Sequence, residues 1–129
     1  MKTFEKNITV VTDDLDELNH VNNVRYVKWV NDIAKEHWLL LASDNILENY
    51  FWVALSHHIE YKSAAILDDV IKIKTYVLKS EGVTSTRIVE MYHSETNKLV
   101  AKSETNWCFV NSQTKRPTRI IQEIIDLFH

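Results

Sequence analysis

The sequence has one cysteine, one glycine and one proline in 129 residues. A single cysteine excludes an internal disulfide bond. A single glycine, Gly82, excludes the dinucleotide-binding fingerprint and the phosphate-binding P-loop, because each needs more than one glycine at a fixed spacing. No block of basic residues is present and the net charge is −3. We therefore do not expect nucleic acid as the main partner, since phosphate binding needs clustered Lys and Arg.

Long hydrophobic runs are also missing. The apolar runs fall well short of the roughly 20 residues that span a membrane, and the first residues turn polar too soon for a secretory signal. We therefore expect a cytoplasmic protein without a membrane partner. The only close pair of potential metal ligands is His57 and His58, which would point to opposite faces of a strand. We accordingly expect no metal and no cofactor.

Hydrophobic residues make up 45% of the chain, which predicts one globular domain over residues 1–129. Their periodicity predicts a strand over 4–12, a helix from Asn22 or Asn23 to about Leu41, a helical segment over 44–50, strands over 53–61, 69–79, 83–93 and 99–110, and a short helix approached by Pro117.

The long predicted helix has only one narrow polar stripe, so we expect other structure to wrap most of its circumference. Four consecutive strands at hairpin spacing predict an antiparallel sheet in meander order. The result is an α+β fold, in which a five-stranded antiparallel sheet wraps around one buried helix and a short helix ends the chain. An exposed edge of such a sheet is suited to pair with a second copy.

The segment DLDELNHVNNVRY, residues 14–26, gathers acids, a histidine and three asparagines just before the long helix. A helix N-terminus exposes unpaired N–H groups and partial positive charge. An acid and a histidine beside it can place a nucleophile or base next to an oxyanion site. The structural alternatives are that Asp16 only stabilises the helix end, that His20 makes a structural hydrogen bond, and that Asn22 and Asn23 are caps.

This motif and the order of elements resemble the hotdog-fold thioesterases of the 4-hydroxybenzoyl-CoA thioesterase type. The chain is also similar to the plant acyl-ACP thioesterases, which carry Asp-x-Asn-x-His-Val-Asn-Asn before a tyrosine. HIEYKSA (58–64) and LDDVI (67–71) form a second matching segment. The resemblance implies a hotdog fold, hydrolysis of a thioester with coenzyme A or acyl carrier protein leaving, and a homodimer or tetramer with active sites at the subunit interface.

The resemblance also implies roles for individual residues. Asp16 falls on the family's catalytic acid, acting as nucleophile or as general base for water. His20 falls on the histidine of the plant motif, and Asn23 on a position whose backbone N–H faces the thioester carbonyl. Amides near Asn23 and Val24 would then stabilise the oxyanion.

Three positions depart from the family pattern. Leu18 replaces an asparagine of the plant motif, which leaves Asp16 and His20 as the shared chemistry. Asn19 replaces a frequent glycine, so the loop needs an asparagine in the left-handed conformation, which Asn tolerates. Ser63 replaces the usual proline.

Further residues are candidates for substrate contacts. His58 and Glu60 share one face of a predicted strand and could line the partner's half of the site, or form an exposed polar patch. Lys79, beside the Gly82 turn, is a candidate for the phosphates of coenzyme A, as are Lys62 and Arg87.

Two apolar positions complete the predictions. We expect Cys108 to be a buried thiol rather than a nucleophile, because nothing nearby in the sequence would lower its pKa. Trp52 follows a loop and could border an acyl pocket.

Three functions are compatible with the sequence: an acyl-CoA thioesterase, an acyl-ACP thioesterase, and a hotdog dimer that binds acyl groups without cleaving them. Asp16 distinguishes the enzymes from the binder, because a pure binder has no need for an acid beside a carbonyl site.

Overall fold

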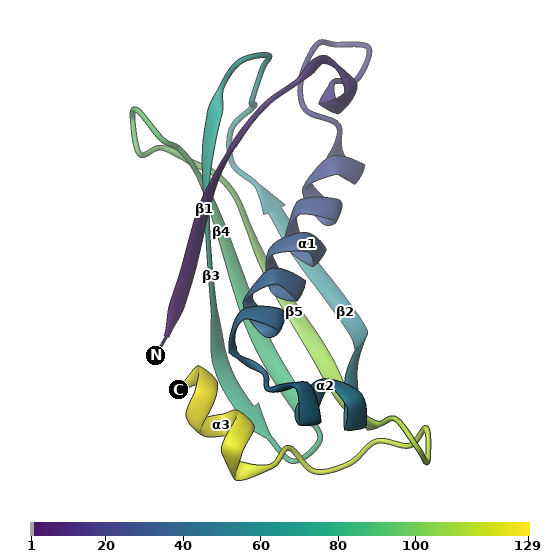
Figure 1. Cartoon of the computed structure of the whole chain (residues 1–129). Coiled ribbons are helices and arrows are strands. Elements are labelled where there is room, and N and C mark those ends of the chain that lie inside the picture. Colours follow the sequence, from purple (N-terminus) through teal and green to yellow (C-terminus); the bar gives the residue numbers. More distant parts are fainter. Residues whose placement is uncertain (1) are drawn as a thin grey trace.

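The computed structural model describes residues 2–129. In it, a five-stranded antiparallel sheet curves around one side of the long helix α1 (Asn23–Leu41), as Figure 1 shows. The remaining elements are β1 (Thr3–Thr9), the 3-10 turn η1 (Thr12–Asp14), α2 (Asp44–Asn49), β2 (Tyr50–Tyr61), β3 (Val70–Glu81), β4 (Thr84–His93), β5 (Leu99–Asn111) and α3 (Gln122–Phe128). The predicted α+β class, with its antiparallel sheet, long helix and short C-terminal helix, is confirmed.

The predicted elements are all present, but the start of the last helix was misplaced. Helix α3 begins at Gln122 with Ile121 as its N-cap, so Pro117 does not introduce it directly. Pro117 instead forms an isolated bridge with Val110 at the end of β5. A proline lacks the backbone N–H, and a single bridge of this kind tolerates that loss better than a strand interior does.

The strand order corrects the predicted meander. Strands β3, β4 and β5 are neighbours in the sheet, as predicted. Strand β2 does not pair with β3: it pairs with β5 and forms the edge opposite β1, which gives the order β1-β3-β4-β5-β2. The connection between β2 and β3 makes no tight hairpin, because β4 and β5 lie between these two strands in the sheet. Ala65 in this connection is fully buried, and its carbonyl accepts a hydrogen bond from the Val21 amide at 2.9 Å.

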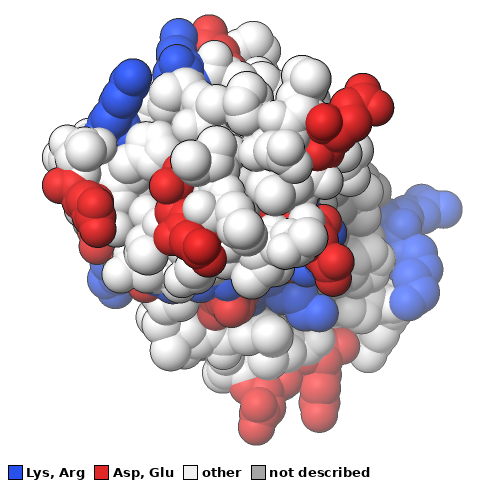
Figure 2. All heavy atoms as spheres, turned by 90° about the horizontal axis from the view of Figure 1, so that it is seen from above, with Lys and Arg blue, Asp and Glu red and all other residues white. Residues whose placement is uncertain are grey.

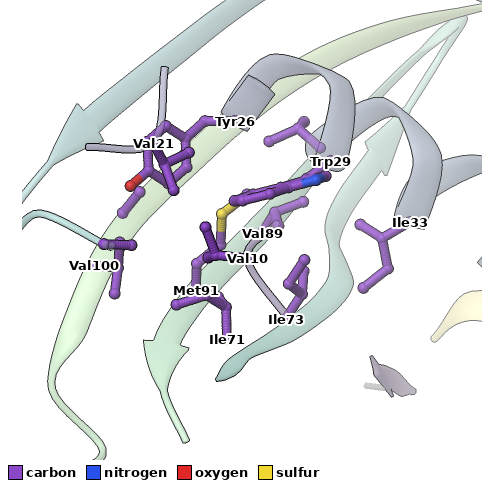
Figure 3. Close-up of a cluster of buried hydrophobic side chains, with 13 residues drawn as sticks. Val10, Val21, Tyr26, Trp29, Ile33, Ile71, Ile73, Val89, Met91 and Val100 are labelled. Atoms are coloured by element: carbon purple, nitrogen blue, oxygen red, sulfur yellow. The ribbon is translucent and has the colours of Figure 1, made fainter. Parts of the chain in front are cut away.

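The main core lies between α1 and the concave face of the sheet, as Figure 3 shows. The predicted alternation in β3 is confirmed, since Ile71, Ile73 and Val77 are buried whereas Lys72 and Lys74 are only partly so. Burying these aliphatic side chains against the helix supplies the main driving force for docking it on the sheet, because removing apolar surface from water is favourable. A second cluster joins α3, α2 and the C-terminal half of α1.

Helix α1 is covered on one side only. Its buried residues are Tyr26, Trp29, Val30, Ile33, Ala34 and His37. Val24, Leu39 and Leu40 are 74%, 50% and 64% exposed. The expectation that other structure wraps most of the helix is therefore not met within residues 2–129, where the sheet, with α2 and α3 at the C-terminal half, leaves one side of α1 exposed.

Candidate active site

The loop before α1 closes on itself at the N-terminal end of the helix. Leu15 and Val21 form a bridge across its ends, and the Asp16 amide donates to the His20 carbonyl at 2.8 Å. Asn19 has φ 59°, which confirms the left-handed conformation predicted for this position. Asparagine adopts this conformation at lower cost than most residues, so a glycine is not needed here.

Within this loop, the two oxygens of the Asp16 carboxylate differ in their hydrogen bonds. Oδ1 accepts hydrogen bonds from the amides of Leu18 at 2.9 Å and His20 at 3.2 Å. Oδ2 makes no hydrogen bond within residues 2–129, and the residue is half-buried. One oxygen therefore holds the loop in shape while the other is left available to a ligand.

The His20 side chain is exposed and makes no hydrogen bond to the part of the chain that the structure describes. Its contact with Asp16 runs through the backbone amide. The ring is therefore not what holds Asp16 in this structure.

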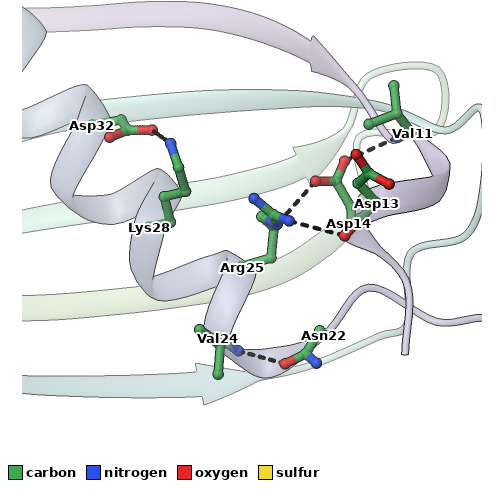
Figure 4. Close-up of polar contacts among 8 residues, drawn as sticks. All are labelled: Val11, Asp13, Asp14, Asn22, Val24, Arg25, Lys28 and Asp32. Carbon is green, nitrogen blue, oxygen red and sulfur yellow. Dashed lines mark hydrogen bonds and ion pairs between the residues drawn. The ribbon is translucent and has the colours of Figure 1, made fainter. Parts of the chain in front are cut away.

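The N-terminus of α1 offers fewer amides than predicted. Asn22 is the N-cap, and its Oδ1 accepts from the Val24 amide at 2.9 Å, as Figure 4 shows. The prediction that the Val24 amide is available to an oxyanion is therefore wrong for this conformation, because the cap already occupies it. The Asn23 amide makes no hydrogen bond within residues 2–129 and is the remaining donor at this end.

An ion pair that the sequence analysis missed ties this loop to the helix. The Asp14 side chain is 10% exposed; its Oδ1 lies 3.0 Å from Arg25 Nε, and its Oδ2 accepts from the Val11 amide at 2.9 Å. Arg25 also donates to the Asp13 carbonyl at 2.9 Å (Figure 4). Hydrophobic periodicity cannot reveal a buried acid in an irregular segment, and the acidic start of the motif was the only available signal.

The predicted pair on β2 lies together but faces away from Asp16. His58 Nε2 is 3.7 Å from Glu60 Oε1, and both side chains are largely exposed. Ile59 packs into the core and Tyr61 contacts the ring of Tyr26 on α1, so His58 and Glu60 lie on the outer face of the sheet. Lys62, 3.4 Å from Glu60, is the main reason why the pKa of that carboxyl is lowered.

The basic candidates are separated from the loop. Lys79 lies near the end of β3, whereas Thr9, shortly before the loop, pairs with Val70 at the start of that strand. Arg87 is only 6% exposed and faces α1 rather than the outer surface of the sheet. Cys108 is buried, as predicted.

A cavity of about 280 Å³ lies between the C-terminal half of α1, the sheet and α3. Trp52 lines it, together with Trp38, Trp107, Phe128, Arg87 and Ser85. Lys35 at its rim is 12 residues along α1 from Asn23, or about 18 Å at the helical rise of about 1.5 Å per residue. Within one protomer, the cavity is therefore distinct from the loop that holds Asp16.

Three further observations concern metal ligands, membrane-spanning helices and surface charge. Within residues 2–129, no group of three or more His, Cys, Asp or Glu side chains is placed to hold a metal ion. The same residues include no helix that is both long enough and apolar enough to cross a membrane. Figure 2, which views the molecule from above, shows acidic and basic side chains interspersed on that face.

Comparison with protein families finds a match to the thioesterase-like superfamily over residues 10–128. A comparison with curated protein sequences finds no match.

Solved structures share the fold. A 1,4-dihydroxy-2-naphthoyl-CoA thioesterase from Synechocystis is 14% identical, with a TM-score of 0.84 over 98% of this chain and 95% of that chain. A probable thioesterase from Escherichia coli is 21% identical, with a TM-score of 0.83 over 95% and 94%. A hypothetical protein from Staphylococcus aureus, in complex with CoA, is 20% identical, with a TM-score of 0.86 over 98% and 81%. These similarities confirm the predicted hotdog fold.

Proposed function

The chain belongs to the thioesterase-like superfamily, and from this premise we propose that it is an acyl-CoA thioesterase that produces a free acid and coenzyme A. The observation that carries the proposal is the Asp16 carboxylate, which has one oxygen held by two amides and the other unpaired within residues 2–129, near the N-terminus of α1. Structurally similar proteins described as a CoA thioesterase and as a complex with CoA support coenzyme A as the leaving group.

In the proposed reaction, the thioester carbonyl lies at the N-terminus of α1, where the Asn23 amide donates to the developing oxyanion. One donor of this kind typically lowers the barrier by roughly 3 kcal/mol. Asp16 Oδ2 either attacks the carbonyl carbon and forms a mixed anhydride that water then hydrolyses, or removes a proton from the attacking water. Both routes expel the coenzyme A thiolate and require no cofactor.

His20 is the proposed proton donor to the leaving thiolate, or the residue that orients water. Its ring is exposed beside the same loop and is free of hydrogen bonds to the rest of residues 2–129. A thiolate is a good leaving group, so we expect a smaller loss on replacing His20 than on replacing Asp16.

We also propose that the protein acts as a homodimer or as a tetramer. The apolar residues Val24, Leu39 and Leu40 are exposed on α1, and β2 forms an edge of the sheet. A second copy would cover these surfaces. In such an assembly, His58, Glu60 and Lys79 are the proposed contacts for a substrate that is shared with the partner.

Thiol release from short, long and aromatic acyl-CoAs, followed with a thiol-reactive dye, tests the proposal. We expect turnover by the wild type and a loss of about 100-fold or more in Asp16→Asn. Glu17→Gln is the matched control, because Glu17 is an exposed neighbouring acid without a hydrogen bond to the described residues. Circular dichroism establishes that each variant is folded.

The alternatives give different results in the same assay. Turnover that survives in Asp16→Asn would remove Asp16 from the mechanism. If the folded wild type cleaves no acyl-CoA, acyl carrier protein thioesters are the next substrates, and inactivity on these as well would favour a non-catalytic acyl-binding dimer.

A further inference from the structure

Arg87 is a buried cation without a carboxylate partner. It lies on β4 facing α1, and its Nη1 donates to His37 Nδ1 at 2.9 Å and to Thr75 Oγ1 at 3.1 Å. The Phe128 ring centroid is 5.6 Å from its guanidinium carbon. No ion pair joins Arg87 to any Asp or Glu within residues 2–129. A buried charge of this kind is costly unless something compensates it.

His37 does not supply that compensation. Burial, and after it the charge of Arg87, lowers the pKa of His37 to about 4, so the ring is neutral at pH 7 and accepts through Nδ1. Burial also lowers the pKa of Arg87 to about 10, which leaves the guanidinium charged at pH 7. The positive charge therefore persists in the interior.

Some of the N–H groups of the Arg87 guanidinium make no hydrogen bond within residues 2–129. Both of its hydrogen bonds use Nη1, and neither Nε nor Nη2 makes one within residues 2–129. Only Ser103 Oγ and Trp107 Nε1 are fully enclosed side-chain atoms without a partner in that part of the chain. The unpaired nitrogens of Arg87 are therefore not sealed off, and the cavity that Arg87 lines is the space they can reach.

The cavity itself favours an anion attached to a flat apolar group. Aromatic rings dominate its walls, with Trp38 and Trp52 meeting edge to face at 5.7 Å. Lys35 and Arg87 give it two cations, and no Asp or Glu lines it. The walls thus offer aromatic surface, positive charge and hydrogen-bond donors.

We propose that this cavity binds a small planar aryl carboxylate, with the ring packed among the tryptophans and the carboxylate accepting hydrogen bonds from Arg87. Its volume of about 280 Å³ suits a ligand of one or two rings, since typical ligand pockets begin at about 300 Å³. The inference goes beyond the proposed hydrolase activity, because within one protomer the cavity lies about 18 Å along α1 from Asn23.

Calorimetric titration of the free protein with 2-naphthoate and with the neutral 2-naphthamide tests this site. We expect 2-naphthoate to bind, and 2-naphthamide to bind at least about 10-fold more weakly, because hydrogen bonds to a charged acceptor are stronger. Equal affinities for the two ligands, or no binding of either, would overturn the proposal. This comparison uses the wild type alone and does not depend on turnover, so its failure is distinguishable from a failure of the thioesterase proposal.

Variants then test the role of the guanidinium. Arg87→Met should weaken the binding of 2-naphthoate at least about 10-fold and change the binding of 2-naphthamide little. Arg119→Met, at an exposed arginine, should leave both affinities unchanged. Arg87→Lys retains the charge if Arg87→Met does not fold, and should bind 2-naphthoate more tightly than 2-naphthamide. Unchanged 2-naphthoate affinity in folded Arg87→Met would contradict the assignment.

Two sources can supply such a carboxylate: the distal end of an acyl group, or a separate free acid. Inhibition of thiol release by 2-naphthoate distinguishes them. Competition with acyl-CoA would assign the cavity to the acyl group, and binding without competition would assign it to a separate acid.

Discussion

Protonation of His37 should destabilise the folded protein as the pH falls from about 6.5 to about 4. The ring is 1% exposed and its pKa is lowered from 6.5 to about 4, first by burial and then by Arg87. Phe4 of β1 stacks on the ring at 5.6 Å, and Phe128 of α3 meets it edge to face at 5.0 Å. Neither phenyl ring titrates, so Arg87 is the only charged side chain among these partners.

The sign of the effect follows from which state binds the proton first. Between pH 6.5 and 4, the unfolded chain carries a proton on His37 that the folded chain does not, so stability rises with pH across this window. This destabilisation of the folded state is absent above about pH 6.5 and reaches its full size below about pH 4. The difference between 6.5 and about 4 corresponds to roughly 3 kcal/mol, since one pKa unit is about 1.4 kcal/mol.

Urea unfolding at pH 7, 6, 5 and 4 measures this effect when the wild type is compared with His37→Gln. Glutamine retains an acceptor for Arg87 but does not titrate, so the carboxylates that also protonate in this range affect both proteins. We expect the stability of the wild type relative to the variant to fall by roughly 3 kcal/mol between pH 7 and 4. Parallel pH profiles for the two proteins would refute the assignment of a neutral, buried His37.

Two further predictions concern the loop before α1, and urea unfolding measures both. Asp14→Asn should lower the free energy of unfolding by about 3 kcal/mol, because it leaves Arg25 without its carboxylate partner. Adding Arg25→Met to this variant should recover part of the loss. A loss below about 0.5 kcal/mol would show that the ion pair contributes little to stability. Asn22→Ala should cost about 1 kcal/mol by removing the acceptor for the Val24 amide, whereas Asn22→Ser should retain most of the stability. Equal stabilities of the two Asn22 variants would contradict a capping role.

Local features of this protein could be read from neighbouring residues. The alternation of Ile71, Lys72 and Ile73 predicted a strand with one buried face, because side chains along a strand point to opposite sides. A cap at Asn22 or Asn23 and the left-handed conformation of Asn19 were likewise predictable, because both depend on contacts within a few residues, and the structure places the cap at Asn22. The position of Asp16 before the helix followed from the same local motif.

Only the tertiary structure decided features that join distant parts of the chain. The sequence did not reveal that β2 pairs with β5, because hairpin spacing states which strands are neighbours in the chain and not which exchange hydrogen bonds. Arg87 is a second example, since His37, its hydrogen-bonding partner, is 50 residues away in the sequence.

Sequence therefore determined the elements, the motif and the family resemblance, all of which rest on local periodicity and on short-range hydrogen bonds. Tertiary packing decided which polar groups are available. It buried Arg87 beside a neutral His37 in an aromatic cavity, and it left one oxygen of Asp16 unpaired within residues 2–129. The physical reason is that burial and charge compensation depend on every element packed around a group, and no short segment of sequence contains them.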